Sequence, residues 1–297
     1  MRIGIDLGGS KTEGIVMGHG GEILHRLRRT TPATWGYDAV LGNIADLVGE
    51  LEQLAGQTCS VGIGTPGAIS TVTGNLKNSN TVCLNNRPVQ QDLSHMLSRE
   101  IRMENDANCF ALSEAVDGAG KGQNIVFGII MGTGVGGGIV VGRQLISGAQ
   151  HIAGEWGHNI LEMNGPDCYC GRKGCVETFL SGPGLVNQYT ANGGHVGVEP
   201  NEIVQQANRG ETLAKKTMTD FLDRFGRAVA TVINILDPDV VVIGGGLSNI
   251  NYLYTGGRKR VEYYVFNDEL RTAIVPNKHG DSSGVRGAAW LWPVIDS

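Results

Sequence analysis

Short hydrophobic runs alternate with glycine-rich turns along the chain, and their spacing predicts a mixture of strands and helices. Residues 2–6 are predicted as a buried strand, residues 13–17 as a second strand and residues 22–29 as a third, which would pair as an antiparallel meander. Residues 37–54 then repeat hydrophobic side chains at the spacing of one helical face. The N-terminal part of the chain is therefore predicted to be an α/β unit.

The next predicted elements place Asp106 at the junction of a strand and a helix. Residues 60–64 and 101–103 read as strands, with a short helix at 93–100 between them. The following helix begins around residues 104–108, so Asp106 lies where a strand gives way to a helix, a usual place for ligand chemistry in α/β proteins. An N-cap aspartate is the alternative, because Asp and Asn are preferred helix caps.

The second half of the chain repeats the pattern of the first. A strand at 124–131, a glycine turn at 132–137 and a returning strand at 138–141 echo residues 2–17. The glycine- and alanine-rich segment 117–124 is predicted to be a hinge. Further helices are predicted at 201–208, at 212–236, near Asn249 and at 281–290, with a core strand at 240–243 before a glycine turn.

Several glycine motifs match nucleotide fingerprints only formally. Gly62-x-Gly64-x-x-Gly67 and the similar run from Gly132 fit the dinucleotide pattern, but neither opens the helix which that pattern requires. The turn at residues 8–12 is not a P-loop, because a strand follows it. It can still present backbone amides, a hydroxyl and Lys11 to phosphate oxygens.

Composition narrows the class of protein. The chain has 297 residues, 46 of them glycine, with 6% aromatic residues, which fits a loop-rich α/β enzyme of one large or two ordinary domains. A net charge of −5 argues against a protein that coats nucleic acid. No signal segment or membrane span is recognised, so a cytoplasmic location is expected.

One stretch carries a candidate metal site. His158, Cys168, Cys170 and Cys175 match the ligand set of a closed tetrahedral Cys3His zinc site. Their spacing departs from the commoner zinc pattern, so a disulfide and a tight turn of reduced thiols stay open as alternatives. The remaining cysteines are scattered, which fits a reducing compartment, where clustered thiols are more often metal ligands.

Two glutamates flank this stretch. Glu155 precedes His158 by three residues, and Glu177 follows Cys175 by two. A metal held by the histidine and the cysteine would also fix both carboxylates, which are suited to gripping the hydroxyls of a small polar molecule. Solvated loop acids are the alternative.

Together these motifs resemble the ROK family (repressors, open reading frames, kinases) of the sugar kinase and actin-like ATPase superfamily. The resemblance covers essentially the whole chain and rests above all on Glu155-Trp156-Gly157-His158 followed by Cys168-x-Cys170-Gly171-x-x-Gly174-Cys175-x-Glu177. It implies a two-lobed α/β fold of the actin-like ATPase (sugar kinase/Hsp70/actin) class with a ligand cleft between the lobes. The lobes would span residues 1–118, joined by a C-terminal helix at 281–297, and residues 119–280, with a zinc loop at 155–177.

The resemblance also implies a role for each matching residue. Asp106 matches the catalytic base, and His158 matches a zinc ligand together with Cys168, Cys170 and Cys175. Sugar contacts are implied for Asn105, Glu155, His158 and Glu177, with Asn80 as a further candidate whose alternative is a turn asparagine. ATP contacts are implied for Gly4, Asp6, Gly8, Gly9, Ser10, Lys11, Thr12, Gly132, Thr133, Gly134, Gly244 and Gly245, with Mg2+ near Asp6.

The implied activity is phosphorylation of a hexose 6-hydroxyl, with ATP, Mg2+ and structural Zn2+ as cofactors. Residues 77–80, 84–85, 113–119 and 278–290 most resemble bacterial fructokinases that also accept mannose, so fructose is the expected acceptor. Residues 105–115 equally resemble N-acetylglucosamine kinases, and glucose comes third. A homodimer is expected, without nucleic-acid or membrane partners. A sugar-sensing repressor of the family is disfavoured, because a strand at residue 2 leaves no room for a helix-turn-helix domain.

Overall fold

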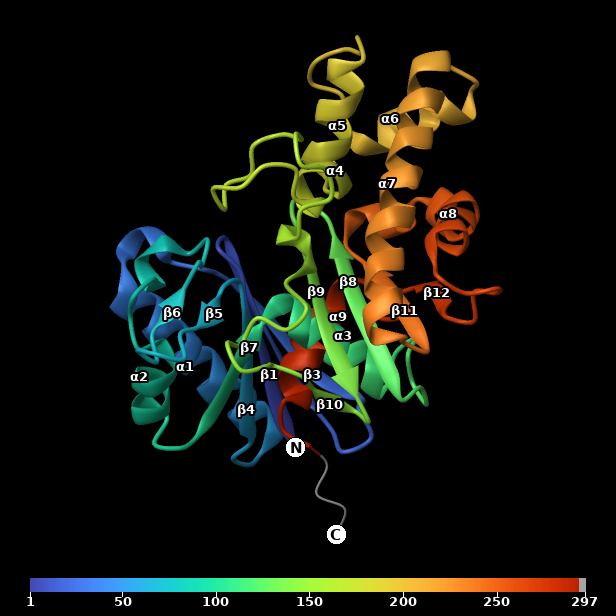
Figure 1. Cartoon of the computed structure of the whole chain (residues 1–297). Helices are drawn as coiled ribbons and strands as arrows, with labels where there is room; N and C mark the ends of the chain where they lie inside the picture. The colour runs from blue at the N-terminus through green and yellow to red at the C-terminus, as the bar shows by residue number, and fades with distance from the viewer. Residues whose placement is uncertain (294–297) are drawn as a thin grey trace. The chain divides into compact units, whose positions relative to one another are not determined.

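The computed structural model describes residues 1–293 and forms two compact units (Figure 1). The first unit contains Met1–Gly122, Gly138–Ala153 and the C-terminal segment from Asp281, and the second contains Gln123–Gly137 and Gly154–Gly280. The boundary at Gly122 falls inside the segment predicted as a hinge. Residues 138–153 group with the first unit, whereas the sequence placed them in the second. The end of the expected C-terminal helix, at 294–297, lies outside the described residues.

The first sheet has five strands in the order β3-β2-β1-β4-β7. β1 pairs antiparallel with β2 and parallel with β4, β2 pairs antiparallel with β3, and β7 runs parallel to β4. The predicted three-stranded meander is therefore confirmed, and the carboxyl ends of β1, β4 and β7 meet at one edge. The strands are β1 (Arg2–Leu7), β2 (Lys11–Met17), β3 (Ile23–Thr30), β4 (Ser60–Thr65) and β7 (Ile101–Asn105).

Two helices of this unit test the predicted helical pattern. α1 (Tyr37–Ala55) buries its hydrophobic face in one core with β1 and β4, as its spacing predicts. α2 (Val89–Met96) begins and ends four residues earlier than the predicted 93–100. It starts directly after Pro88, which suits a helix start because proline lacks an amide proton, and it ends before Ser98, whose φ of 52° leaves the helical region.

The C-terminal helix of this unit lies very close to the sheet. α9 (Ser283–Trp290) packs on β1, on β4 and on α3 (Asp106–Val116), which confirms the predicted closing helix from residue 283. A Cβ at Gly62 would lie only 1.8 Å from the carbonyl oxygen of Ala288. The glycine at this position of the formal dinucleotide motif therefore serves helix packing, which agrees with the rejection of that motif.

The second sheet repeats the first, with the order β10-β9-β8-β11-β12. β8 pairs parallel with β11, and β11 pairs parallel with β12, in the same arrangement as β1, β4 and β7. The internal repeat predicted from the sequence is thus confirmed, and it extends from a strand pair to a whole five-stranded sheet. The strands are β8 (Ile125–Met131), β9 (Val135–Val141), β10 (Gln144–Leu145), β11 (Val240–Gly244) and β12 (Ala273–Pro276).

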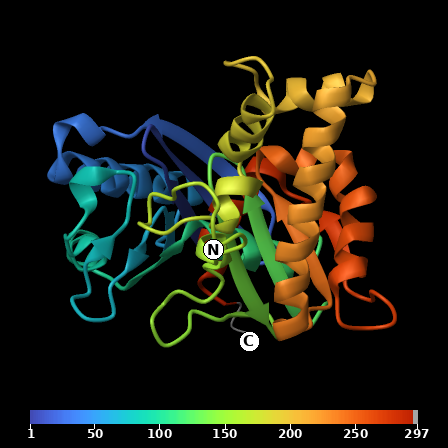
Figure 2. The same ribbon diagram turned by 45° about the horizontal axis from the view of Figure 1, so that its top comes forward.

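The longest helix of the second unit is α7 (Thr212–Leu236), with the bounds that the sequence predicts. Its N-cap is Glu211, whose carboxylate accepts hydrogen bonds from the first helical amides, and its C-cap is Asp237, in the left-handed region. α7 and α8 (Gly256–Tyr264) lie side by side in both views (Figures 1 and 2). The helices beside it are α4 (Val176–Leu180), α5 (Gly182–Ala191), α6 (Pro200–Asn208) and α8 (Gly256–Tyr264).

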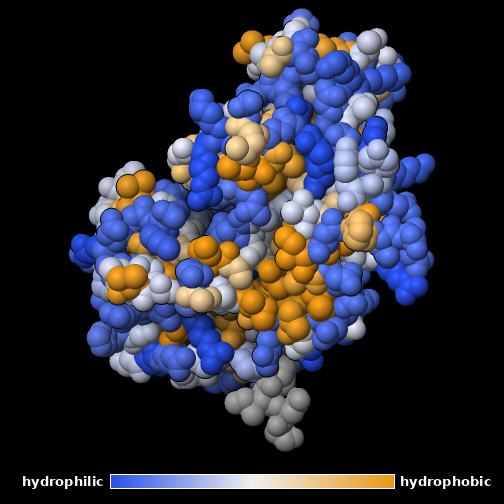
Figure 3. Space-filling model, viewed as in Figure 1, coloured by the Kyte–Doolittle hydropathy of each residue, from blue (hydrophilic) through white to orange (hydrophobic). Residues whose placement is uncertain are grey.

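The remaining elements are short. The helix expected near Asn249 is replaced by two turns of 3-10 helix, because the chain bends at Ile250 between them. These and the other short elements are β5 (Ala68–Ile69), β6 (Leu76–Lys77), and the 3-10 turns Ala33–Trp35, Val82–Leu84, Trp156–His158, Gly246–Asn249, Asn251–Leu253 and Gly280–Ser282. Within residues 1–293, no helix has the length and hydrophobicity needed to cross a membrane. The face shown in Figure 3 is mostly hydrophilic and is interrupted by several hydrophobic areas.

Candidate active site

Two aspartates lie at the carboxyl edge of the first sheet. Asp6 is near the end of β1, in register with Glu13 on β2 and Gly64 on β4, and Asp106 follows β7 directly. Burial, together with the negative charges of Asp106 and Glu13, raises the pKa of Asp6 to about 6. A half-buried carboxylate whose ionisation is disfavoured by negative neighbours is suited to a cation, because oxygen ligands of this kind bind Mg2+.

Asp106 is the first residue of α3, and it is not the helix cap. Asn105 is the N-cap, and its side-chain oxygen accepts a hydrogen bond from the Ala107 amide at 2.8 Å. The N-cap alternative for Asp106 is therefore wrong, although its Oδ1 also accepts from the Ala107 amide at 2.9 Å. Burial raises the pKa of Asp106, which moves this carboxyl toward the range of a proton acceptor near neutral pH.

Two asparagines predicted to hold sugar have different surroundings. Asn105 donates from Nδ2 to the Gly67 carbonyl at 2.9 Å, so capping and this bond together fix its side chain. Asn80 is exposed, and a Cβ at Gly9 would lie 3.5 Å from its Oδ1. Asn80 therefore lies beside the turn at residues 8–12, and sugar contact stays a prediction for both residues.

That turn is braced by a threonine which the sequence analysis missed. Thr31 donates from Oγ1 to the Gly8 carbonyl at 2.8 Å and from its amide to the Ser10 carbonyl at 3.0 Å, and its hydroxyl also lies 2.8 Å from that of Thr12. Lys11 is exposed at the tip. The only sequence signal for Thr31 is its place just after the strand that pairs with β2.

Gly4, predicted among the ATP contacts, packs closely against α9. It lies buried within β1, and a Cβ there would lie 2.1 Å from the carbonyl oxygen of Val285 in α9. The helix thus leaves no room for a side chain at this position, and the ATP contact of Gly4 stays a prediction.

Glu104 is a second residue that sequence analysis missed. Its Oε1 accepts from the Asn105 amide at 3.0 Å and from Nδ2 of Asn108 at 3.1 Å, while Oε2 accepts from the Ser147 hydroxyl at 3.2 Å. These bonds hold the strand end that presents Asp106. Its position two residues before the aspartate was the available signal.

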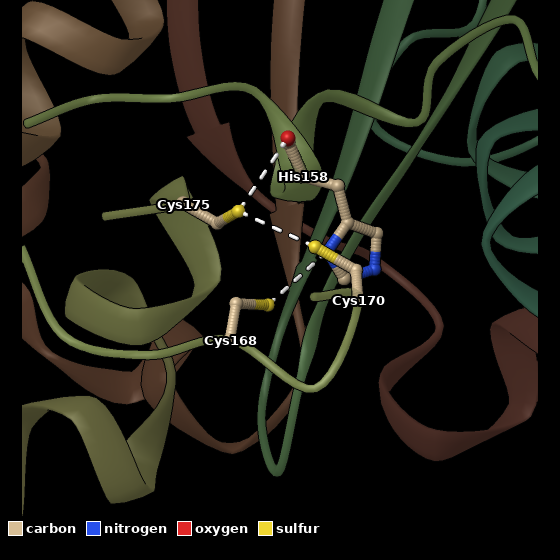
Figure 4. A group of neighbouring side chains, drawn as sticks. All are labelled: His158, Cys168, Cys170 and Cys175. Atoms are coloured by element: carbon tan, nitrogen blue, oxygen red, sulfur yellow. Dashed lines mark hydrogen bonds between the residues drawn. The ribbon is translucent and has the colours of Figure 1, made fainter. Parts of the chain in front are cut away.

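In the second unit, the four predicted metal ligands converge (Figure 4). Their ligand atoms all lie within 4.8 Å of one another. Sγ of Cys168 is 3.6 Å from Nδ1 of His158, and Sγ of Cys170 is 3.6 Å from that of Cys175. Bonds of about 2.1–2.3 Å at tetrahedral angles would separate ligand atoms by about 3.4–3.8 Å, so this donor set fits zinc. All three thiols are free, and the disulfide alternative is not supported.

The loop reaches this geometry through two glycines with positive φ. Gly171 has φ 85° and Gly174 has φ 66°, which residues with a side chain rarely adopt. A Cβ at Gly174 would in addition lie 1.6 Å from the Glu162 carbonyl oxygen. The glycine-rich linker is therefore what allows three thiols and an imidazole to face one point.

The outer edge of the histidine ring has a partner that the sequence did not predict. Nε2 of His158 lies 2.9 Å from the hydroxyl of Tyr169, an exposed residue between Cys168 and Cys170. Such a partner orients a metal-binding ring whose Nδ1 faces the thiols. The sugar contact predicted for His158 would be made at the same ring edge.

The loop that carries the four predicted metal ligands is fixed to the start of β9. Nε1 of Trp156 donates to the Gly136 carbonyl at 3.1 Å, and a Cβ at Gly157 would lie 2.1 Å from the Val135 carbonyl oxygen. Glu177 accepts from the Val135 amide at 2.9 Å through Oε2. This bond immobilises Glu177. Glu155, the other flanking glutamate, lies exposed at the N-cap of the turn Trp156–His158.

Two glycine turns lie side by side at the carboxyl edge of the second sheet. The turn at 132–134 follows β8, and its Gly132 amide donates to the Gly134 carbonyl at 2.9 Å. The turn at 244–246 follows the neighbouring strand β11, and a Cβ at Gly132 would lie 3.9 Å from the Gly246 amide nitrogen. Backbone amides gathered in this way can bind phosphate oxygens, as predicted for Thr133 and its neighbours.

Comparison with known proteins assigns the chain to a family. The model of the ROK family matches residues 2–294. An N-acetyl-D-glucosamine kinase from Shigella boydii serotype 4 (strain Sb227) is 38% identical over 301 residues, which cover 98% of this chain and 99% of that protein.

Solved structures agree in fold. The ROK hexokinase from Thermus thermophilus has a TM-score of 0.88 and 28% identity, over 97% of this chain and 96% of that one. A ROK family glucokinase from Streptomyces griseus, in complex with glucose and AMPPNP, has a TM-score of 0.79 and 26% identity, over 98% of each chain. These likenesses confirm the expected actin-like ATPase fold class, and the chain belongs to the ROK family.

Proposed function

We propose that the protein is an ATP-dependent hexose kinase that phosphorylates the 6-hydroxyl of its sugar. The observation that carries this proposal is the pair Asp6 and Asp106, which lie at one sheet edge and have raised pKa values. Phosphoryl transfer depends mainly on positioning and charge stabilisation, and it needs one group that accepts the proton of the attacking hydroxyl. Asp106 is proposed as that base, with Asp6 near the Mg2+ of the nucleotide.

The second unit is proposed to supply ligand-binding groups. Amides of the turns at 132–134 and 244–246 would bind nucleotide phosphates, as would the turn at 8–12 in the first unit. Glu155, His158 and Glu177 would accept hydrogen bonds from, or donate them to, sugar hydroxyls. A site built to pair with hydroxyls discriminates strongly against ligands that lack them, because its polar groups would be left unpaired.

Zinc is proposed for the Cys3His cluster, held by His158, Cys168, Cys170 and Cys175. A closed site with four protein ligands supplies folding energy rather than a reactive water. Its contribution would be to keep the loop between the Trp156–His158 turn and α4 in one conformation. Glu177, in the first turn of α4, would thereby keep its place.

The preferred acceptor is the finer part of the proposal. The 38% identity to an N-acetyl-D-glucosamine kinase over nearly the whole chain favours N-acetylglucosamine over the fructose expected from the sequence. Fructose, with mannose, is kept as the second candidate because residues 77–80 and 278–290 resemble fructokinases.

A coupled assay of ATP-dependent phosphorylation tests both the kinase activity and the preferred acceptor. We expect turnover on at least one of N-acetylglucosamine, fructose, mannose, glucose and N-acetylmannosamine, with the highest kcat/KM on N-acetylglucosamine. A higher kcat/KM on fructose or mannose would reverse the proposed order of the acceptors, and the hexose kinase proposal would stand. Absence of turnover on all five sugars would contradict the hexose kinase proposal.

A further inference from the structure

One oxygen of Glu177 is already in use before any ligand arrives. Glu177 lies in the first turn of α4, and its Oε2 accepts from the Val135 amide at 2.9 Å. A Cβ at Gly134 would lie 2.7 Å from the same oxygen, so the glycine leaves the space that this carboxylate occupies. Hydrogen bonds from backbone amides to a carboxylate are stronger than those between neutral groups.

The junction between α4 and α5 is bonded to the other end of the turn at residues 132–135. The Gly182 amide at the start of α5 donates to the Gly132 carbonyl at 2.8 Å, and the Ser181 amide donates to the Glu177 carbonyl at 3.2 Å. Both ends of the turn at 132–135 are therefore bonded to one short stretch of chain, residues 177–182. This stretch follows directly on the last metal ligand, Cys175.

We propose that Glu177 is a positioning residue for the nucleotide turn, and that it couples sugar binding to nucleotide binding. The inference rests on the proposed function, in which the turn binds phosphate and Glu177 contacts the sugar. Oε2 fixes the Val135 amide, and Oε1 is the oxygen assigned to a sugar hydroxyl. A sugar that orders this carboxylate also orders the turn, and by reciprocity each ligand tightens the other.

Two substitutions distinguish the effect of the hydrogen bond from the Val135 amide from the effect of the negative charge on Glu177. Glu177→Gln keeps a side-chain oxygen that can accept from Val135, whereas Glu177→Ala removes the acceptor. The probe is AMPPNP with Mg2+, titrated by calorimetry with and without the preferred sugar. We expect Glu177→Ala to weaken AMPPNP binding about fivefold in the absence of sugar, the worth of one hydrogen bond, and Glu177→Gln to stay within about twofold.

Titrations that include the sugar should give a different pattern in the two variants. Both substitutions should raise the sugar Kd, because each removes the carboxylate that accepts from the hydroxyls. Only Glu177→Ala should abolish the effect of sugar on AMPPNP affinity. Glu202→Gln, at an exposed position on α6, makes the same change in charge and serves as the control with unchanged affinities.

Two results would overturn the inference. Unchanged AMPPNP affinity in Glu177→Ala would show that the turn does not depend on this residue, and equal losses in both variants would show that charge alone matters. Amide hydrogen exchange at Val135 is the independent readout, with faster exchange expected only in Glu177→Ala. If the wild-type protein binds no sugar while Val135 responds in this way, the proposed function fails and the positioning of the turn stands.

Discussion

The two sheets share one strand arrangement but carry different chemistry at the carboxyl ends of their strands. In the first sheet, β1 and β7 lead to Asp6 and Asp106, two carboxylates with raised pKa values. In the second, β8 and β11 lead to glycine turns at 132–134 and 244–246. A repeated fold thus places the strand ends, while the residues that follow decide whether an edge is suited to protons and cations or to anions.

The difference predicts where sensitivity to pH should arise. The raised pKa values of Asp6 and Asp106 move their ionisation to higher pH, whereas backbone amides do not titrate near neutral pH. Substitutions at the first edge should therefore change catalysis and its pH dependence. Substitutions at the second edge should change binding.

The largest effect is expected at the proposed base. Asp106→Asn keeps the size of the side chain but removes its ability to accept a proton, so kcat should fall by about 10²–10⁴-fold. Sugar and AMPPNP affinities should stay near those of the wild type. Steady-state kinetics combined with calorimetry measures both. Near-normal kcat would remove Asp106 from its proposed role.

The next largest effect is expected at the Cys3His cluster, for which zinc is proposed. Cys170→Ser should release the metal and raise the sugar Kd by about tenfold or more, since the loop that fixes Glu177 would lose its anchor. Elemental analysis and calorimetry give the two values. Cys83→Ser, a thiol outside the cluster, is the matched control. One bound metal per chain in the Cys170 variant, with normal sugar affinity, would contradict the link.

The sequence predicted this cluster because its ligands lie in one short stretch and thiols have a narrow range of roles. It also predicted the strand meander, the internal repeat and α7, whose hydrophobic spacing is regular over 25 residues. Local patterns of this kind survive in the fold because neighbouring residues decide them. The sheet order of the second half follows from the repeat and could have been proposed from it.

Contacts between distant parts of the chain could not be predicted in the same way. Thr31 braces the Gly8 carbonyl across 23 positions, and Glu104 bonds to Ser147 across 43. Nothing in the residues around either partner specifies the other. The packing requirement at Gly4 could not be predicted for the same reason, because its neighbour in α9 lies near the other end of the chain.

A smaller effect, on stability, is expected from Asp6→Asn. Because the pKa of Asp6 is raised from 3.8 to about 6 on folding, its ionisation disfavours the folded state. The wild type should lose stability as pH rises from about 4 to 6. The variant should be more stable above pH 6 by on the order of 1–3 kcal/mol, and the difference should vanish near pH 4. Urea unfolding without added Mg2+, at several pH values, measures it. A difference that does not vary with pH would show that the ionisation of Asp6 is not its cause.

The smallest effect distinguishes two glycines of one turn. A Cβ at Gly134 would lie 2.7 Å from Oε2 of Glu177, whereas the nearest atom to a Cβ at Gly132 is 3.9 Å away. Gly134→Ala must therefore displace the carboxylate by a few tenths of an ångström, and the sugar KM should rise by about threefold to tenfold. Gly132→Ala should leave the sugar KM within about twofold, whatever it does to nucleotide binding. Equal changes in sugar KM would mean that the fit of Glu177 over Gly134 does not govern sugar binding, and that the glycines of this edge matter only for access of phosphate to the amides.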